Sequence, residues 1–168
     1  HSLNVRSDNL YAESVLRLLS LSVHEKGSAE KGIDIIRKYW QNYEADSLEL
    51  FMYDGSGLAR NNKVSAKYLN CVLKETALDS LIGEYFVQTL PLAGKEGSVA
   101  TFMKHGELPG ELRLKSGSMS DVHAYAGYYT TPQNRYAIVV MINNYTCTRA
   151  QLKQKISTLL TQVLSKKE

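Results

Sequence analysis

The stretch Leu112-Arg113-Leu114-Lys115-Ser116-Gly117-Ser118-Met119-Ser120 decides how the chain is organised. Apolar and charged residues alternate over its first four positions, and the chain then breaks into Ser-Gly-Ser. This pattern predicts an edge strand whose last turn exposes a charge at Lys115, a hydroxyl at Ser116 and a glycine-thinned backbone at Gly117. An anionic peptide end would suit all three groups. A solvated lysine at a strand end gives the same pattern, so the stretch needs support from the rest of the chain.

Two further strands and a helix are predicted after this stretch. Residues 122–130 form the second strand, and Thr131-Pro132-Gln133-Asn134 turns the chain into residues 136–143. This last segment is almost entirely apolar, so we expect a central strand that is covered on both faces. Thr148-x-x-Gln151 matches a capping box and predicts an amphipathic helix that ends near Leu164.

The chain before residue 111 is predicted to be mainly helical. Residues 1–9 are polar and end in Ser7-Asp8-Asn9, where Ser7 or Asp8 can cap the helix that follows. Apolar spacing predicts four helices: from Leu10 to about Val23, from Ser28 to Trp40, after Ser65, and over about 80–90. The buried stripe of the second helix is expected to be Ile33, Ile36, Tyr39 and Trp40. A short extended piece at 48–52 ends in a glycine turn at 54–57, and residues 92–97 form a loop. The fold class is therefore α+β: a helical half, a three-stranded antiparallel meander and a C-terminal helix.

Composition restricts the possible functions. The 168 residues suit one domain, and 43% hydrophobic with 22% charged residues is ordinary for a globular protein. The net charge of +3 is too small and too dispersed to indicate a nucleic-acid partner. No apolar run reaches the roughly 20 residues of a membrane span, and no signal peptide is recognised. Cys71 and Cys147 lack CxxC spacing and the four histidines are scattered, so we expect no metal site. Cys71 lies on an apolar helix face, which suits a buried position. Whether the two cysteines form a disulfide is open at this point.

Ser28-Ala29-Glu30-Lys31 matches S-x-x-K, the pattern of a serine nucleophile with a lysine base. We reject that interpretation for two local reasons. Ser28 follows a glycine at a polar helix start, where a capping serine is expected. No apolar wall would desolvate Lys31 and make it a base.

Two other weak motifs become specific in combination. S-D-N occurs as Ser7-Asp8-Asn9 and K-T-G as Lys115-Ser116-Gly117, where Ser116 keeps the hydroxyl; penicillin-binding proteins and class A β-lactamases use this pair together with S-x-x-K. The surrounding stretches run in a fixed order: Ser7–Glu13 (SDNLYAE), 54–60 (DGSGLAR), 90–98 (LPLAGKEGS), 115–120 (KSGSMS) and 126–128 (AGY). Over essentially its whole length the chain resembles the C-terminal portion of the class C low-molecular-mass penicillin-binding proteins, the D-Ala-D-Ala carboxypeptidase/endopeptidase family, which has a β-lactamase/transpeptidase-like fold.

The chain departs from this family in two places. Ala59 stands where members usually have a serine, which would alter local hydrogen bonding. The family's S-x-x-K comes before every motif seen here, and Ser28 lies after S-D-N, so the nucleophile is expected outside this chain. Residues 1–168 would then be the C-terminal part of one penicillin-binding domain whose N-terminal part is absent. Strand 136–143 would lie next to the position of the absent N-terminal strand.

The resemblance implies a serine acyl-enzyme mechanism without metal or organic cofactor. Lys115 and Ser116 would bind the terminal carboxylate of the substrate. Ser7 would relay a proton to the leaving amine, and Asn9 would hold the acyl-donor amide and the catalytic lysine. The Ser118 backbone N–H would be an oxyanion donor. The remaining implied substrate-binding residues are Gly117, Met119 and Ser120.

The implied substrate, a peptidoglycan stem peptide, places the protein in the periplasm or elsewhere outside the cytoplasm. β-Lactam antibiotics and the absent N-terminal part are the other expected partners, and a homo-oligomer is compatible with the sequence. The main alternative is a non-catalytic peptide-binding module that retains only the carboxylate-binding strand. A β-lactamase is disfavoured, because the 54–58 and 90–94 stretches match the carboxypeptidases and no Glu-x-x-x-Asn deacylation segment stands out.

Overall fold

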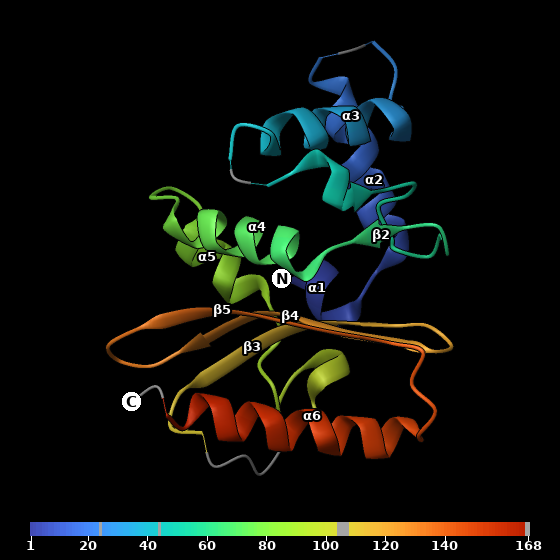
Figure 1. Cartoon of the computed structure of the whole chain (residues 1–168). Helices are drawn as coiled ribbons and strands as arrows, with labels where there is room; N and C mark the ends of the chain where they lie inside the picture. Colours follow the sequence, from blue (N-terminus) through green and yellow to red (C-terminus); the bar gives the residue numbers. More distant parts are fainter. Residues whose placement is uncertain (24, 44, 104–107, 167–168) are drawn as a thin grey trace.

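The computed structural model describes residues 1–23, 25–43, 45–103 and 108–166, so His24 and His105, two of the scattered histidines, lie outside the described residues. A three-stranded sheet separates two helical layers (Figure 1). The helices are α1 (Ser2–Arg6), α2 (Asn9–Leu21), α3 (Ala29–Trp40), α4 (Ala66–Leu78), α5 (Gly83–Thr89) and α6 (Arg149–Leu164), with short 3-10 turns η1 (Ser47–Glu49) and η2 (Gly97–Val99). The strands are β1 (Leu50–Phe51), β2 (Lys63–Val64), β3 (Glu111–Ser118), β4 (Val122–Thr130) and β5 (Arg135–Asn143).

The main sheet is the predicted antiparallel meander in the order β3-β4-β5. Leu112 pairs with Tyr129 between β3 and β4, and Tyr125 pairs with Val140 between β4 and β5. The helical half covers one face and α6 covers the other (Figure 1). The α+β class and the sheet topology are thus as predicted.

Two cores lie on opposite faces of this sheet. On the α6 face, fully buried side chains of β3 and β4 pack against one stripe of α6 at every fourth residue: Leu112, Leu114, Tyr125, Tyr129, Leu152, Ile156, Leu160 and Leu164. On the other face, Tyr128 packs against α4 and α5 and donates a hydrogen bond from its hydroxyl to the Leu73 carbonyl at 2.7 Å. Burial raises the pKa of Tyr128 to about 12, which keeps this donor protonated.

Side-chain caps begin most of the helices where the sequence predicted them. Asp8 caps α2 by accepting from the Tyr11 N–H, while Ser7 does not act as the cap. Ser65 caps α4, and Thr148 with Gln151 forms the predicted capping box of α6. These caps fix the helix starts within a residue of the predicted positions.

Three predictions about the fold need correction. The polar lead-in contains the short helix α1, which lacks a side-chain cap and rests on η2 and α5. Tyr39 is not buried but 52% exposed, because α3 turns only part of the expected stripe, chiefly Ile33, towards α2. Strand β5 is not central: among the described residues it pairs with β4 alone, and β4 is the middle strand.

The apolar run of β5 still has cover on both faces. Ile138, Val140 and Ile142 pack against the α6-side core, and Ala137 and Val139 pack against the α4–α5 side. The prediction of two covered faces is therefore confirmed. The second edge of β5 is unpaired among the described residues, and this is the edge where the absent N-terminal strand was expected. Cys71 and Cys147 form no disulfide, and Cys71 is half-buried. No helix within the described part of the chain has the length and apolarity to cross a membrane.

Candidate active site

The candidate site lies where the turn between α1 and α2 meets the end of β3. The Lys115 Nζ donates to Ser7 Oγ at 2.9 Å, a contact between residues 108 positions apart in the chain. The same ammonium donates to the Ser116 carbonyl at 2.6 Å. Burial lowers the pKa of Lys115 below the usual lysine value. The structure therefore brings together Ser7 of the S-D-N motif and Lys115 of the K-S-G motif, as expected if the two motifs form one site.

Ser7 is held in an unusual backbone conformation at this junction. Its φ of 55° and ψ of 49° lie in the left-handed region, which a residue with a Cβ seldom adopts. The Ser7 and Asp8 N–H groups both donate to the Leu3 carbonyl and so end α1. This turn points the Ser7 hydroxyl at Lys115. Asn9, the third residue of the motif, is the exposed first residue of α2.

Among the described residues, the outer edge of β3 is paired over only part of its length. Leu114 N–H donates to the Pro91 carbonyl at 3.0 Å, and Ala93 N–H donates to the Leu112 carbonyl at 2.8 Å. Since backbone groups on one edge of a strand recur every second residue, the N–H groups of Ser116 and Ser118 face the same edge, beyond the end of this pairing. An extended ligand could continue the line of the 91–93 segment there.

Gly117 lies on this open stretch of the edge. A Cβ placed on Gly117 would meet only the Ala124 Cβ, at 4.0 Å, so packing within the described chain does not require a glycine. Ser118 is also exposed. The space beside Gly117 is therefore available to a ligand backbone.

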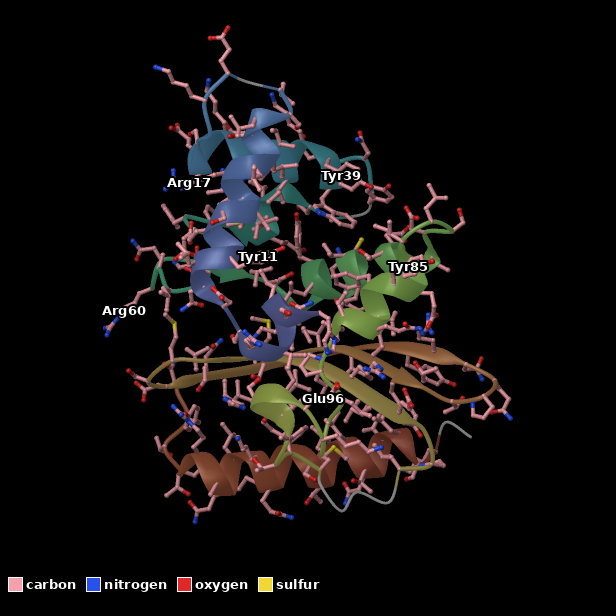
Figure 2. The ribbon with its side chains drawn as sticks, turned by 180° about the vertical axis from the view of Figure 1, so that it is seen from behind. Tyr11, Arg17, Tyr39, Arg60, Tyr85 and Glu96 are labelled. Atoms are coloured by element: carbon pink, nitrogen blue, oxygen red, sulfur yellow. The ribbon has the colours of Figure 1, made fainter. Side chains whose placement is uncertain are left out.

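A serine that the sequence analysis did not select also belongs to the site. Ser98 Oγ, at η2, lies 2.6 Å from Ser116 Oγ. Ser98 follows the 92–97 loop, which carries Glu96 (Figure 2). The only sequence indication was its place in a quoted motif, because a contact between two serines 18 residues apart has no pattern of its own.

The 54–60 motif is tied to the start of α2. Glu13 Oε1 accepts from the Gly55 and Ser56 N–H groups, each at 3.0 Å. Burial alone would raise the pKa of Asp54, but hydrogen bonds from Asn62 Nδ2, Ala59 N–H and Gly57 N–H lower it below its usual value. Ala59, where a serine was expected, thus makes its structural hydrogen bond through the backbone.

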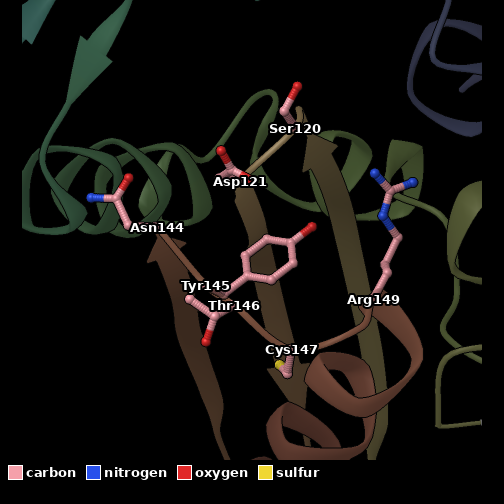
Figure 3. A pocket seen from close by; sticks show the side chains of 7 residues that line it. All are labelled: Ser120, Asp121, Asn144, Tyr145, Thr146, Cys147 and Arg149. Atoms are coloured by element: carbon pink, nitrogen blue, oxygen red, sulfur yellow. The ribbon is translucent and has the colours of Figure 1, made fainter.

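An open pocket of about 840 Å³ lies at the end of the sheet between the β3–β4 hairpin and the segment that joins β5 to α6 (Figure 3). Ser120 and Asp121 of the β3–β4 hairpin line one side, and Cys147 and Arg149 line the side towards α6. Ser120 therefore borders both this pocket and the end of the open edge. The other residues at the pocket are Asn144, Tyr145 and Thr146.

Known proteins are similar to this chain over most of its length. A D-alanyl-D-alanine carboxypeptidase of Actinomadura sp. is 26% identical over 144 residues, which are 83% of this chain and 27% of that protein. The D-alanyl-D-alanine carboxypeptidase DacB of Haemophilus influenzae is 27% identical over 161 residues, 92% of this chain and 33% of that protein. The chain thus spans about a third of the length of these relatives.

A solved structure agrees with them. Penicillin binding protein 4 (dacB) from Haemophilus influenzae, complexed with a β-lactam, superposes with a TM-score of 0.80 at 26% identity, covering 97% of this chain and 40% of that one. The family model for the D-Ala-D-Ala carboxypeptidase 3 (S13) family matches residues 1–166. The chain belongs to the D-Ala-D-Ala carboxypeptidase 3 (S13) family.

Proposed function

We propose that the intact protein is a serine-type D-alanyl-D-alanine carboxypeptidase that acts on peptidoglycan stem peptides through an acyl-enzyme. The observation that carries this proposal is the 2.9 Å contact between Lys115 Nζ and Ser7 Oγ, which brings together two of the three motifs that penicillin-binding proteins use. Family membership and the similarity to carboxypeptidases support the same activity. A peptidoglycan substrate implies a location outside the cytoplasm, in the periplasm or elsewhere in the bacterial cell envelope.

Lys115 and Ser116 bind the terminal carboxylate of the substrate in this proposal. The Lys115 ammonium supplies a charge-assisted hydrogen bond, which is stronger than a neutral one. The ligand lies along the open edge of β3 beside Gly117, with its chain running back towards Met119 and Ser120. In this proposal the stem-peptide side chain enters the open pocket that Ser120 borders.

The reaction is the transfer of an acyl group to a serine and then to water. The serine oxygen bonds to the carbonyl carbon of the penultimate D-Ala and the C–N bond breaks. The proton lost by the serine hydroxyl is relayed through the Ser7 hydroxyl to the leaving D-Ala amine. The Ser118 N–H stabilises the oxyanion, and Asn9 holds the acyl-donor amide. Water then hydrolyses the ester and regenerates the serine.

The nucleophilic serine lies outside this chain in our proposal. Ser28 Oγ accepts from the Lys31 N–H at 3.4 Å as the cap of α3, which supports a structural role for the Ser28-x-x-Lys31 match. Residues 1–168 are then the C-terminal part of one penicillin-binding domain. The outer edge of β5, where Ala137 receives one side-chain hydrogen bond from Asn70, is where the N-terminal part would add its strand.

A substitution at Lys115 tests the proposed activity. In the protein expressed from the complete gene, we expect release of D-Ala from diacetyl-L-Lys-D-Ala-D-Ala and acylation by labelled penicillin. Lys115→Ala should weaken acylation by about 1.5–3 kcal/mol, the worth of a hydrogen bond to a charged group. The exposed Lys38→Ala is the matched control. A complete protein that binds the peptide without cleaving it would instead indicate a non-catalytic binding module.

A further inference from the structure

The contact between Ser98 and Ser116 bears on how the carboxylate anchor is built. Lys115 and Ser116 are neighbours on β3, so their side chains leave opposite faces of the strand. Lys115 meets Ser7 on the face of the helical half, and Ser116 meets Ser98 of η2 on the other. Ser98 is exposed and Ser116 is half-buried. A ligand carboxylate at this edge would therefore find Ser116 already hydrogen-bonded on its far side.

The backbone around Ser98 is fixed by several independent contacts. Gly97 has a φ of 52°, and a Cβ there would lie 2.4 Å from the Val5 carbonyl of α1, so this close approach requires glycine. Val99 is fully buried, and its carbonyl accepts from the Gly94 N–H at 2.9 Å. The hydroxyl of Ser98 is thus presented to Ser116 by a segment anchored to α1, the same short helix that leads into Ser7.

Proton counting gives this contact a direction. Each serine hydroxyl has one proton to donate, and a carboxylate only accepts. When Ser116 donates to a bound carboxylate, its contact with Ser98 can persist only if Ser98 donates to Ser116 Oγ. Two hydroxyls in series then point one way, and each polarises the next.

We propose that Ser98 is a positioning residue that holds the Ser116 hydroxyl as a donor to the terminal carboxylate of the substrate. This inference rests on the proposed function. It adds Ser98 to the residues that select a substrate with a free C-terminal carboxylate. Without Ser98, the Ser116 proton is free to rotate towards solvent or the backbone. The cost falls on ligands that end in a carboxylate and spares ligands that end in an amide.

The experiment compares two peptides on the protein expressed from the complete gene. The substrates are diacetyl-L-Lys-D-Ala-D-Ala and the same peptide with a C-terminal amide, and kcat/KM is measured from the released amine. Ser98→Ala should lower kcat/KM on the carboxylate peptide about three- to tenfold, the worth of one neutral hydrogen bond, and change the value for the amide less. Ser98→Thr keeps the hydroxyl and should restore the carboxylate preference. Ser22→Ala, an exposed serine at the end of α2, is the control.

A double substitution and direct binding separate the remaining outcomes. Ser98→Ala should cost little more when Ser116 is already alanine, because the two hydroxyls act as one unit. An equal loss on both peptides, or none, would overturn the role of Ser98 while leaving the carboxypeptidase activity intact. If the protein cleaves neither peptide, calorimetric binding of the carboxylate peptide to wild type and Ser98→Ala decides: weaker binding by the variant supports the inference alone, and no binding by wild type removes both proposals.

Discussion

At the scale of single residues, Ser7 combines a motif position with a strained backbone. A left-handed conformation costs a residue with a Cβ about 1–2 kcal/mol, so a side chain kept there usually has a use. Its hydroxyl meets Lys115 across the chain. The motifs predicted which two residues to pair, but neither the left-handed turn nor the contact with Ser116 made by Ser98 has a periodic signature. Such contacts depend on how loops lie on the sheet and are seen only in three dimensions.

His123 shows a second residue-scale property that the sequence did not reveal. Its side chain is 3% exposed and packs edge-on against Tyr125, at 4.8 Å between ring centroids. Neither ring nitrogen has a hydrogen-bond partner among the described residues. Burial, and then the positive charges of Lys153 and Arg149, lowers the pKa of His123 below its usual value. The folded protein thus holds a neutral imidazole between β4 and α6.

This environment predicts a loss of stability in acid. The folded-state pKa of His123 lies below the unfolded value of about 6.5, so the unfolded chain binds the proton first as the pH falls. Its contribution is fully present above pH ~6.5 and is lost towards the lower folded pKa, with a slope of at most about 1.4 kcal/mol per pH unit. His123→Leu should flatten this part of the curve in urea unfolding at pH 5 to 8. Parallel curves for wild type and His123→Leu would contradict the assignment, and the exposed His1→Gln is the control.

At the scale of elements, the alternating segments were the most predictable. β3 and β4 follow period-two patterns ended by Ser-Gly and a Pro-containing turn, and α2, α4 and α6 begin at side-chain caps. The short α1 has no such start signal, because tertiary contacts rather than propensity hold it. The apolar run of β5 predicts burial on two faces, which is a property of its side chains. It cannot say which strand hydrogen-bonds to its edge, which is a property of the sheet.

Hydrogen bonds between α2 and the 54–57 turn join two of the motif stretches that lie far apart in the sequence. Glu13 stands one turn beyond Asn9 and accepts two N–H groups of the turn with a single carboxylate oxygen. The start of α2, which carries Asn9, and the glycine turn are thus joined as one unit. Residues 7–13 and 54–60, which are separate stretches of the sequence, therefore form one hydrogen-bonded junction beside the candidate site.

Removing Glu13 should loosen this junction locally. Glu13→Ala leaves the Gly55 and Ser56 N–H groups without their acceptor, and hydrogen bonds to a charged group contribute about 1.5–3 kcal/mol. Amide hydrogen exchange in residues 53–60 should therefore accelerate by about one to two orders of magnitude. Glu13→Gln keeps a neutral acceptor and should fall between wild type and alanine. Unchanged exchange in Glu13→Ala, or an equal change in the exposed Glu25→Ala, would show that the hydrogen bonds to Glu13 do not stabilise the turn.

At the scale of the whole molecule, two surfaces have the character of an interior. The α2 side chains Leu10, Tyr11 and Leu18 are 78%, 58% and 61% exposed. The outer edge of β5 pairs with no described strand. Apolar helix faces are usually covered by other elements, and strand edges are usually paired or protected. Both features therefore support the proposal that this chain is part of a larger domain.

The isolated chain should consequently bind no penicillin covalently. The Lys115 ammonium and the Ser116 hydroxyl can hold a β-lactam carboxylate, but neither supplies the attacking oxygen of an acyl-enzyme. Ser7 is the nearest alternative nucleophile, and the lysine beside it donates to its oxygen rather than removing its proton. Mass spectrometry of the 168-residue chain after exposure to labelled penicillin should show no adduct. Co-expression with the N-terminal part, or the complete gene product, should give one adduct per molecule.

The position of any adduct decides between the remaining interpretations. A stoichiometric adduct on the isolated chain that disappears in Ser7→Ala would make Ser7 the nucleophile, helped by the lowered pKa of Lys115. An adduct on Ser28 would overturn its assignment as the cap of α3, which its contact with the Lys31 N–H supports. Labelling of the complete protein on a serine before residue 1, abolished by Ser→Ala at that position and slowed by Lys115→Ala, is the expected result. It would locate the nucleophile in the N-terminal part of the domain and support the assignment of the carboxylate anchor and the proton relay to this chain.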